Sequence, residues 1–394
     1  MQFSANISKL QPSATIAVSS LAKRLRAEGR DIIDLSAGEP DFDTPEWISQ
    51  AAIEAIREGH TRYTPTPGMP ELRKAIADFV RRPGGRDIDW NGVVVSSGAK
   101  QALFNACFAL FGPGDDVLIG APYWTSYPEI VQLARAEPVF VQGDEEQGFL
   151  LTPEVLDAAV TPATKGLLFS SPSNPTGVVY SLDELEAVAR WARDRGIWLI
   201  SDEIYRHIQF GPGREAPGIL DLPSDALGPW VLIDGASKSF AMTGWRIGFS
   251  VSEPDVAAQL GALQSHITSN PSAPSQMAAL AAYGNPERTV EAVAEMRAAF
   301  HRRRDLMVRL FQQRLPQLPF LEPQGAFYLF FNVEALFTEG RQTATDVCSW
   351  ILQEAGVAVV PGEAFGAPAY ARLSYATSDA QLEAAVDRIA ALLG

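Results

Sequence analysis

Short apolar runs alternate with amphipathic stretches between residues 93 and 251, and this alternation dominates the chain. The runs have strand length and almost no polar position inside them, which is typical of parallel strands covered on both faces. The stretches between them carry apolar residues at helical spacing. The pattern predicts an α/β protein with a mainly parallel sheet between layers of helices. The runs that we expect to form strands are 93–97, 117–119, 166–170, 197–201 and 230–233.

Both ends of the chain follow other patterns. Helical spacing over 14–27 precedes a short apolar run at 32–36, and helices are expected from 254 to about 315. The tail after residue 327 alternates strand-like and helix-like stretches, so we expect a second, smaller α+β domain there. The long helical stretch also carries a basic run that we interpret as a solvated helix face. Its members are Arg297, Arg302, Arg303, Arg304 and Arg309.

Composition narrows the class of protein. The 394 residues are 46% hydrophobic and 20% charged, enough for two domains with a substantial core. The net charge of −15, from 47 acidic and 32 basic residues, disfavours nucleic-acid and membrane partners. Two cysteines, Cys107 and Cys348, make neither a disulfide framework nor a four-thiolate zinc site, and we expect no metal. Without an apolar run of about 18 residues or a signal-peptide core, we expect a soluble, cytoplasmic protein.

Several residues that can carry chemistry follow the expected strands, at the sheet edge where open parallel sheets bind ligands. Lys238 comes after the strand at 230–233 among small residues, as expected for an amine that a carbonyl compound must reach. Such lysines form Schiff bases, including with pyridoxal 5'-phosphate, and this cofactor accounts for the whole set. The set is Ser97, Gly98, Ala99, Lys100, Trp124, Asn174, Asp202, Tyr205, Ser237, Lys238 and Arg246.

The cofactor's ring needs a carboxylate, hydrogen-bond donors and an aromatic neighbour. Asp202 would keep the ring nitrogen protonated. Without the other residues of the set, a helix cap is the more ordinary interpretation of this aspartate. Tyr205 and Asn174 would donate to the ring oxygen. Trp124 would stack on the ring, although a lone tryptophan more often packs in a core.

The cofactor's phosphate needs free amide groups and a guanidinium. The helix start at 97–99 supplies the amides, and Arg246 supplies a bidentate fork, although a salt-bridged surface arginine is the ordinary alternative. Gly38, in the Gly- and Pro-containing loop 37–45, would let backbone approach a ligand closely or would simply form a turn.

Five segments resemble motifs of the class I pyridoxal-phosphate-dependent aminotransferases, in the family's order and over nearly the whole chain. The lysine signature is Ser237-Lys238 followed by Gly244-Trp245-Arg246-Ile247-Gly248. The other four segments are 37–42, 171–177, 201–205 and 372–376.

The resemblance implies the fold-type I architecture, an α/β fold in which a large domain with a mainly parallel seven-stranded sheet carries a smaller α+β domain. It places an N-terminal arm and part of the small domain at 1–40, the cofactor-binding domain at 41–285, and the small C-terminal domain at 286–394. It also implies a homodimer with active sites at the interface, where Tyr63 would reach the phosphate of the neighbouring subunit's cofactor.

The resemblance further implies a ping-pong transamination of small amino acids and 2-oxo acids. Lys238 would act as general base and acid, with Asp202 and Tyr205 as the other catalytic residues. Arg372 would bind the substrate α-carboxylate, and Gly38, Trp124 and Asn174 would also contact the substrate.

Substrate preference depends on two short segments. Residues 12–15, including Thr15, and 97–101 look like the bacterial aspartate and aspartate/prephenate branch. That likeness implies exchange between L-aspartate and 2-oxoglutarate, giving oxaloacetate and L-glutamate. The stretch 265–271 has no arginine, whereas another branch uses one from the neighbouring subunit for the distal carboxylate. Lys100 is the candidate for that role. A cation in a helix's first turn opposes the helix dipole, so a lysine that only fills the surface is disfavoured there.

Other activities remain open on this sequence. Aromatic, prephenate-related or neutral substrates are the alternative to acidic ones on the same scaffold. A pyridoxal-phosphate C–S β-lyase would use the same Lys238 and Asp202. A nicotinamide-dependent oxidoreductase is disfavoured, because no G-x-G-x-x-G follows an early strand. A binding protein without catalysis fits poorly with a complete set of cofactor residues.

Overall fold

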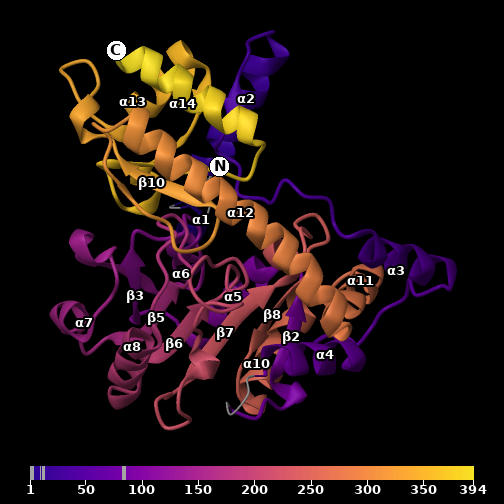
Figure 1. Cartoon of the computed structure of the whole chain (residues 1–394). Helices are drawn as coiled ribbons and strands as arrows, with labels where there is room; N and C mark the ends of the chain where they lie inside the picture. The colour runs from indigo at the N-terminus through magenta and orange to yellow at the C-terminus, as the bar shows by residue number, and fades with distance from the viewer. Residues whose placement is uncertain (1–3, 9, 11–13, 82–85) are drawn as a thin grey trace.

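The computed structural model describes residues 4–8, 10, 14–81 and 86–394, and its centre is a seven-stranded sheet (Figure 1). The strand order is β2-β8-β7-β6-β5-β3-β4, and β8 runs antiparallel to both of its neighbours while the other pairs are parallel. The expected mainly parallel sheet is therefore confirmed. Its strands are β2 (Val93–Ser96), β3 (Asp116–Ala121), β4 (Glu137–Gln142), β5 (Thr164–Ser170), β6 (Trp198–Asp202), β7 (Trp230–Gly235) and β8 (Gly248–Val251).

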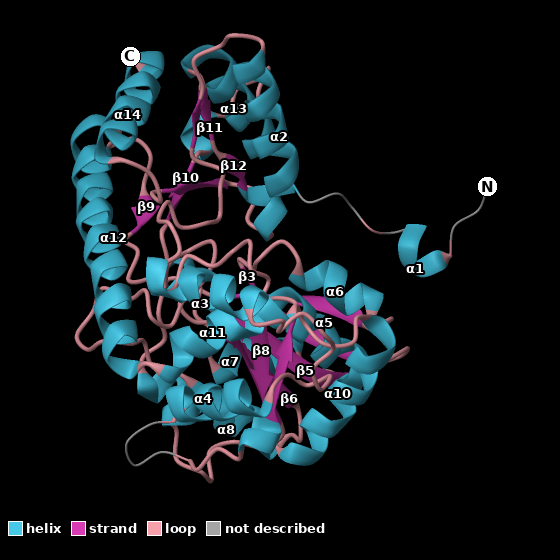
Figure 2. Ribbon diagram, turned by 90° about the vertical axis from the view of Figure 1, so that its right-hand side faces the viewer, coloured by secondary structure: helices cyan, strands magenta, loops and turns pink. Residues whose placement is uncertain are grey.

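Helices cover both faces of this sheet, as Figure 2 shows. Successive strand residues point to opposite faces, so the near-continuous apolar runs feed two separate cores. Leu167 and Leu199 pack in one core, whereas their neighbours Leu168 and Ile200 pack in the other. The helices around the sheet are α3 (Glu46–Arg57), α4 (Pro70–Val80), α5 (Ala99–Leu110), α6 (Tyr127–Leu133), α7 (Pro153–Ala159), α8 (Leu182–Asp194), α9 (Ala236–Ser239), α10 (Pro254–Ile267) and α11 (Ala273–Gly284).

A second, smaller body is built from both ends of the chain. Near the N-terminus β1 (Ile33–Asp34) pairs in parallel with β11 (Val357–Ala358). A four-stranded antiparallel sheet has the order β12-β13-β10-β9. Its strands are β9 (Phe320–Leu321), β10 (Tyr328–Asn332), β12 (Val360–Pro361) and β13 (Tyr370–Ser374). The remaining helices are α1 (Ala5–Ser8), α2 (Ala14–Ala27), α12 (Pro286–Arg314), α13 (Ala344–Trp350) and α14 (Asp379–Leu393), with a π-helical turn at Ile351–Ala355.

The long helix α12 connects the two bodies. In Figure 1 it runs from beside α11 to the far side of β10. It starts at Pro286, next to the expected boundary at 285/286, and the domain limits at residues 40 and 285 stay predictions.

The expectation that the α12 arginines form a solvated face is wrong for two of them. Arg303 is 8% exposed, and its two Nη atoms donate to the Asp41 carboxylate at 2.7 and 2.8 Å. Arg304 donates to Asp305 and to the Pro323 carbonyl. The local pattern of charges does not show that loop 37–45 lies against this helix. Among the described residues, no helix is long and apolar enough to cross a membrane.

Candidate active site

A cavity of about 410 Å³ lies at the carboxyl ends of the central strands, with β10, β13 and loop 37–39 along its other side. It brings together residues from both bodies of the molecule. The predicted site residues that line it are Thr15, Gly38, Ala99, Lys100, Trp124, Asn174, Asp202, Tyr205, Ser237, Lys238, Arg246 and Arg372.

Lys238 projects into this cavity from the short helix α9, which follows β7 directly. Its Nζ donates to the Gly38 carbonyl oxygen at 2.6 Å. Desolvation, together with the nearby Arg246 and Arg372, lowers the pKa of this amine from 10.5 to about 8, against the raising effect of Glu39 and Asp202. The amine therefore loses its proton far more readily than an ordinary lysine, as a nucleophile or general base requires.

Asp202 ends β6 and is 5% exposed. Its Oδ2 accepts from the Tyr127 hydroxyl at 2.8 Å, and its Oδ1 accepts from the Ile204 amide at 3.2 Å. Burial raises the pKa of Asp202 to about 6, although both hydrogen bonds lower it. The alternative as a helix cap does not hold, because turns rather than a helix follow the strand.

Tyr205 lies beyond Asp202 in the same turn, and its hydroxyl is 2.7 Å from the Tyr328 hydroxyl. Both side chains are buried, and burial raises the pKa of each phenol. Two neutral hydroxyl groups therefore meet at this wall of the cavity; one donates to the other, which leaves one proton free for a hydrogen bond to a ligand.

An anion-binding corner forms where Arg246 meets the N-terminus of α5. The Arg246 Nη1 donates to the Thr243 carbonyl at 2.7 Å, and its Nη2 lies 3.5 Å from the Ser97 carbonyl oxygen. Gly98 has φ +93°, and a Cβ there would lie 2.3 Å from Arg246 Nη2. Only glycine leaves room for the guanidinium beside the open amides of the helix. Ser97 and Gly98 thus border the cavity without lining it.

Lys100 lies on the first turn of α5, with its Nζ 4.8 Å from the centre of the Trp124 ring. Burial, and then repulsion from Arg246, lowers the pKa of Lys100. The Lys100 side chain lines the cavity, over the aromatic ring that was predicted to stack on a ligand, while the residue as a whole stays exposed to solvent.

Arg372, on β13, forms the opposite wall and is 2% exposed. Its Nη1 donates to Asn174 Oδ1 and its Nη2 to the Ser36 carbonyl, both at 2.9 Å. The guanidinium stacks over the Tyr328 ring at 4.3 Å, and its Nε finds no hydrogen-bond partner among the residues that the structure describes. Burial lowers the pKa of Arg372. A buried guanidinium with an open donor favours binding of a carboxylate.

Tyr63 is the predicted residue that the structure does not bring to the cavity. It lies between α3 and α4 with 90% of its surface exposed. Its predicted role needs a second copy of the chain and stays a prediction. Of the predicted specificity segment 12–15, Thr15 lines the cavity, whereas Pro12 and Ser13 lie outside the described residues.

Sequence reasoning missed three cavity residues that act on the predicted ones. Tyr127 binds Asp202, Tyr328 binds Tyr205, and Thr243 accepts from Arg246 through its carbonyl and donates to Glu39. Tyr328 begins a stretch with a strand pattern and Tyr127 stands before one with a helix pattern, so neither pattern indicated more than packing. The described residues contain no cluster of three or more His, Cys, Asp or Glu able to hold a metal ion.

Comparison with known proteins agrees with this geometry. A sequence model of the family described as "Aminotransferase class I and II" matches residues 30–389. The aspartate aminotransferase of Geobacillus stearothermophilus is 45% identical, over 99% of this chain and 98% of that protein. The aspartate/prephenate aminotransferase of Thermus thermophilus is 41% identical, over 99% and 98%. The structure of Thermus thermophilus aspartate aminotransferase with maleate superposes with a TM-score of 0.93 at 40% identity, covering all of both chains. The chain therefore belongs to the class I and II aminotransferase family and has its fold-type I architecture.

Proposed function

We propose that this protein is a pyridoxal 5'-phosphate-dependent aminotransferase that moves the amino group between L-aspartate and 2-oxoglutarate. Oxaloacetate and L-glutamate are the products. The observation that carries the proposal is the Lys238 amine, whose pKa is lowered to about 8, in a cavity with Asp202 and Arg246 among its walls. Full-length relatives named aspartate aminotransferase support the substrate.

The residues present fit the cofactor. Lys238 would hold its aldehyde carbon, Asp202 its ring nitrogen, and Tyr205 and Asn174 its ring oxygen. Gly98 leaves the space that lets Arg246 reach the start of α5, where a phosphate would find amides and a guanidinium together. The other residues proposed to hold the cofactor are Ser97, Ala99, Lys100, Trp124, Ser237 and, from a second copy, Tyr63.

When bound, the cofactor supplies an electron sink for the negative charge that develops at the substrate α-carbon. The chain's own contribution begins with Asp202, whose carboxylate holds a proton at the ring nitrogen. Lys238 then moves a proton to and from the reacting carbon, for which a pKa of about 8 is well matched to neutral pH. Tyr205 orients the ring through its hydroxyl.

Arg372 is proposed to bind the α-carboxylate of every substrate. Its Nε and the amide side chain of Asn174 face the same wall, so a carboxylate would bind beside groups that are already fixed. Gly38, whose carbonyl accepts from Lys238, lies at the same end of the cavity. Binding energy at this wall positions the α-carbon near the lysine.

Lys100 is proposed to bind the distal carboxylate of aspartate and glutamate, with Thr15 as a further substrate-binding residue in the lining of the same cavity. No arginine occurs in 265–271, the segment that serves this purpose in another branch. The Lys100 ammonium is partly desolvated, which strengthens its attraction for a carboxylate. We also propose a homodimer with active sites at its interface, a cytoplasmic location, and the domain limits 1–40, 41–285 and 286–394.

The test is a spectrum and an assay on the purified protein. We expect visible absorbance from bound pyridoxal 5'-phosphate that changes on adding aspartate and is restored by 2-oxoglutarate. A protein that binds no cofactor would overturn the proposal. Release of pyruvate from cysteine conjugates without an oxo-acid acceptor would point instead to a β-lyase.

A second acceptor is favoured by one comparison. The Thermus thermophilus relative is named aspartate/prephenate aminotransferase. Prephenate and aromatic substrates should therefore be assayed beside aspartate. A strong preference for aromatic or neutral donors would remove the aspartate assignment and leave the cofactor chemistry in place.

A further inference from the structure

A buried ion pair supports the turn that carries Asp202 and Tyr205, on the side away from the cavity. Glu203 and Arg206 flank the catalytic residues in sequence, yet neither Glu203 nor Arg206 has been given a role above. Glu203 is 1% exposed and Arg206 3% exposed. Arg206 Nη1 donates to Glu203 Oε2 at 2.8 Å, so the side chains of the pair span the turn on the side away from the cavity.

The backbone of this turn is held at several points. The Glu203 amide donates to the Ile233 carbonyl on β7 at 2.8 Å, and the Arg206 amide donates to the Glu203 carbonyl at 2.8 Å. Between these anchors, Ile204 and Tyr205 line the cavity while Glu203 and Arg206 do not. The orientation of the Tyr205 side chain thus depends on the geometry of the Glu203–Arg206 pair.

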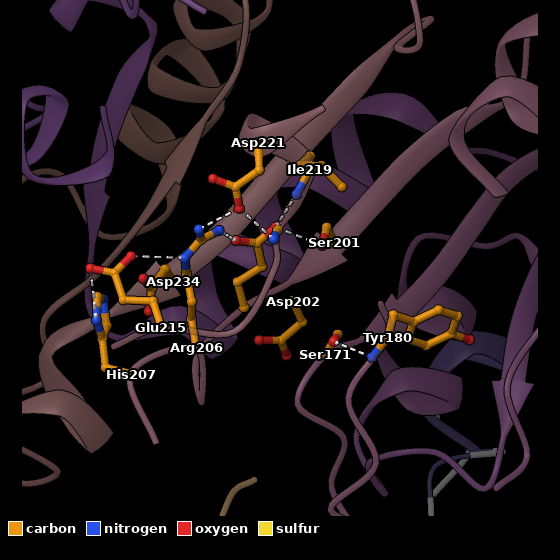
Figure 3. Close-up of polar contacts among 12 residues, drawn as sticks. Ser171, Tyr180, Ser201, Asp202, Arg206, His207, Glu215, Ile219, Asp221 and Asp234 are labelled. Carbon is orange, nitrogen blue, oxygen red and sulfur yellow. Dashed lines mark hydrogen bonds and ion pairs between the residues drawn. The ribbon is translucent and has the colours of Figure 1, made fainter. Parts of the chain in front are cut away.

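The segment 218–221 contacts both members of the pair and fixes their positions. Glu203 Oε1 accepts from the Ile219 amide at 2.8 Å, and Asp221 Oδ2 accepts from Arg206 Nη2 at 2.6 Å (Figure 3). A Cβ on Gly218 would lie 1.8 Å from Arg206 Nη1 and 2.2 Å from Glu203 Oε2. The segment 218–221 therefore packs directly on the ion pair, and only glycine fits at its closest point.

More carboxylates than guanidinium groups lie on the side of Asp202 away from the cavity. Arg206 also contacts Glu215 at 3.3 Å, so three carboxylates surround one guanidinium. These carboxylates raise the pKa of Arg206 although burial alone would lower it. Because removing one partner of a buried pair leaves the other poorly compensated, the innermost carboxylate has the largest effect on the turn.

We propose that the Glu203–Arg206 ion pair is a positioning device for the cofactor's ring: it holds Asp202 and Tyr205 in the orientation that binds the ring. The pair touches neither substrate nor cofactor. Its effect reaches the cavity through the backbone of 202–206. This inference rests on the proposed cofactor role of Asp202 and Tyr205.

The main variant is Glu203→Gln, which keeps the size and the acceptor toward Ile219 but loses the charge against Arg206. Gly218→Ala disturbs the same pair from the opposite segment. The control is Glu215→Gln, which removes a carboxylate from the same arginine at the solvent side, where Glu215 is 32% exposed. Each apoenzyme is first checked for folding by its melting temperature.

The measurement is the dissociation constant of pyridoxal 5'-phosphate for each apoenzyme, by equilibrium dialysis at a temperature where all variants are folded. We expect at least a tenfold weaker affinity for Glu203→Gln and Gly218→Ala, and less than a twofold change for Glu215→Gln. In the loaded enzymes kcat should fall while the KM for the amino donor stays within twofold, because Arg372 is untouched. A purely structural role would lower the melting temperature without this split.

The outcomes separate the two proposals. Wild-type protein that does not bind pyridoxal 5'-phosphate overturns the proposed function. If the wild-type protein binds pyridoxal 5'-phosphate and a folded Glu203→Gln variant binds it with the same affinity, the positioning role is overturned and the proposed function stands. If Glu203→Gln does not fold, Gly218→Ala decides by the same criterion. An equal loss in Glu215→Gln also overturns the inference, because the effect would then not belong to the inner pair.

Discussion

The charge on Lys238 should leave a measurable trace in the stability of the apoenzyme. Its pKa is about 8 in the folded chain against an ordinary 10.5, so between these values the unfolded chain binds more protons. This amine therefore makes the free energy of unfolding rise with pH from about 8 to 10.5, and below pH 8 its full destabilisation, about 3 kcal/mol, is present. Lys238→Met removes the effect.

Urea unfolding of both apoenzymes at several pH values from 7 to 10 checks this expectation. The variant should be the more stable protein at pH 7, and the difference should shrink as pH rises through 8. A difference that stays constant over the range would show that Lys238 is not desolvated in the folded chain.

Lys100 offers a second test, on substrate choice. A charge-assisted hydrogen bond contributes about 1.5–3 kcal/mol, or about one to two decades in kcat/KM. Lys100→Ser should lower kcat/KM for aspartate and glutamate by that amount and leave alanine and phenylalanine nearly unchanged. Equal losses for acidic and neutral donors would assign Lys100 to the phosphate or to packing over Trp124.

Single residues were predictable from sequence where their place after a strand limits their role. Lys238 and Asp202 each follow an apolar run, Arg246 stands just before another, and the cavity contains all three. Tyr127 and Tyr328 were not predictable, because nothing local shows that a phenol in a helix or strand pattern will point at a carboxylate or another phenol. The burial of Arg303 was not predictable for the same reason, since its partner Asp41 is distant in sequence.

At the scale of elements, the start of α5 carries a tight geometric requirement. Gly98→Ala should drive the Arg246 guanidinium from its place, because a Cβ would lie 2.3 Å from Nη2 and the φ of +93° disfavours any side chain. We expect at least a tenfold loss of affinity for pyridoxal 5'-phosphate and a loss of stability of about 1–3 kcal/mol. Dialysis and urea unfolding measure the two effects.

Gly112→Ala, just beyond the other end of the same helix, is the matched control. A Cβ on Gly112 would meet nothing within 4 Å, and its φ is not in the left-handed region. It should change cofactor affinity by less than twofold. An unaffected Gly98→Ala variant would mean that Arg246 is not fixed by this helix.

Helices and strands with strong apolar periodicity were predicted nearly to their ends. The helix expected at 14–27 is α2 (Ala14–Ala27), and the strand expected at 197–201 is β6 (Trp198–Asp202). The place of β8 between β2 and β7 was not predictable from its own residues. Strand order depends on packing between distant segments, for which the local pattern holds no information.

At the scale of the whole molecule, Arg303 connects the long helix α12 to the loop that carries Gly38. Asp41→Asn keeps the shape of the acceptor but removes its charge from a nearly buried guanidinium. We expect a loss of about 1.5–3 kcal/mol in the free energy of unfolding, measured by urea denaturation.

The neighbouring pair Arg302–Asp379 is the control, since the Arg302 side chain is 61% exposed. Arg302→Gln should cost less than about 1 kcal/mol, as exposed pairs do. Equal effects of the two substitutions would show that Arg303 is no more important to the connection between the two bodies than a surface arginine.

The pairing of β1 with β11 has a consequence for how the protein is made. Ala22 and Ile32, near the start of the chain, share a small core with Leu352 and Ala358, near its end. A nascent chain leaves the ribosome with its N-terminal segment first, and domains tend to fold in that order. Here α2 and β1 must wait, with apolar surface uncovered, until residues 352–358 have been synthesised. The large sheet can form before that point, whereas the smaller body closes only after it, so chaperones have long access to residues 14–35.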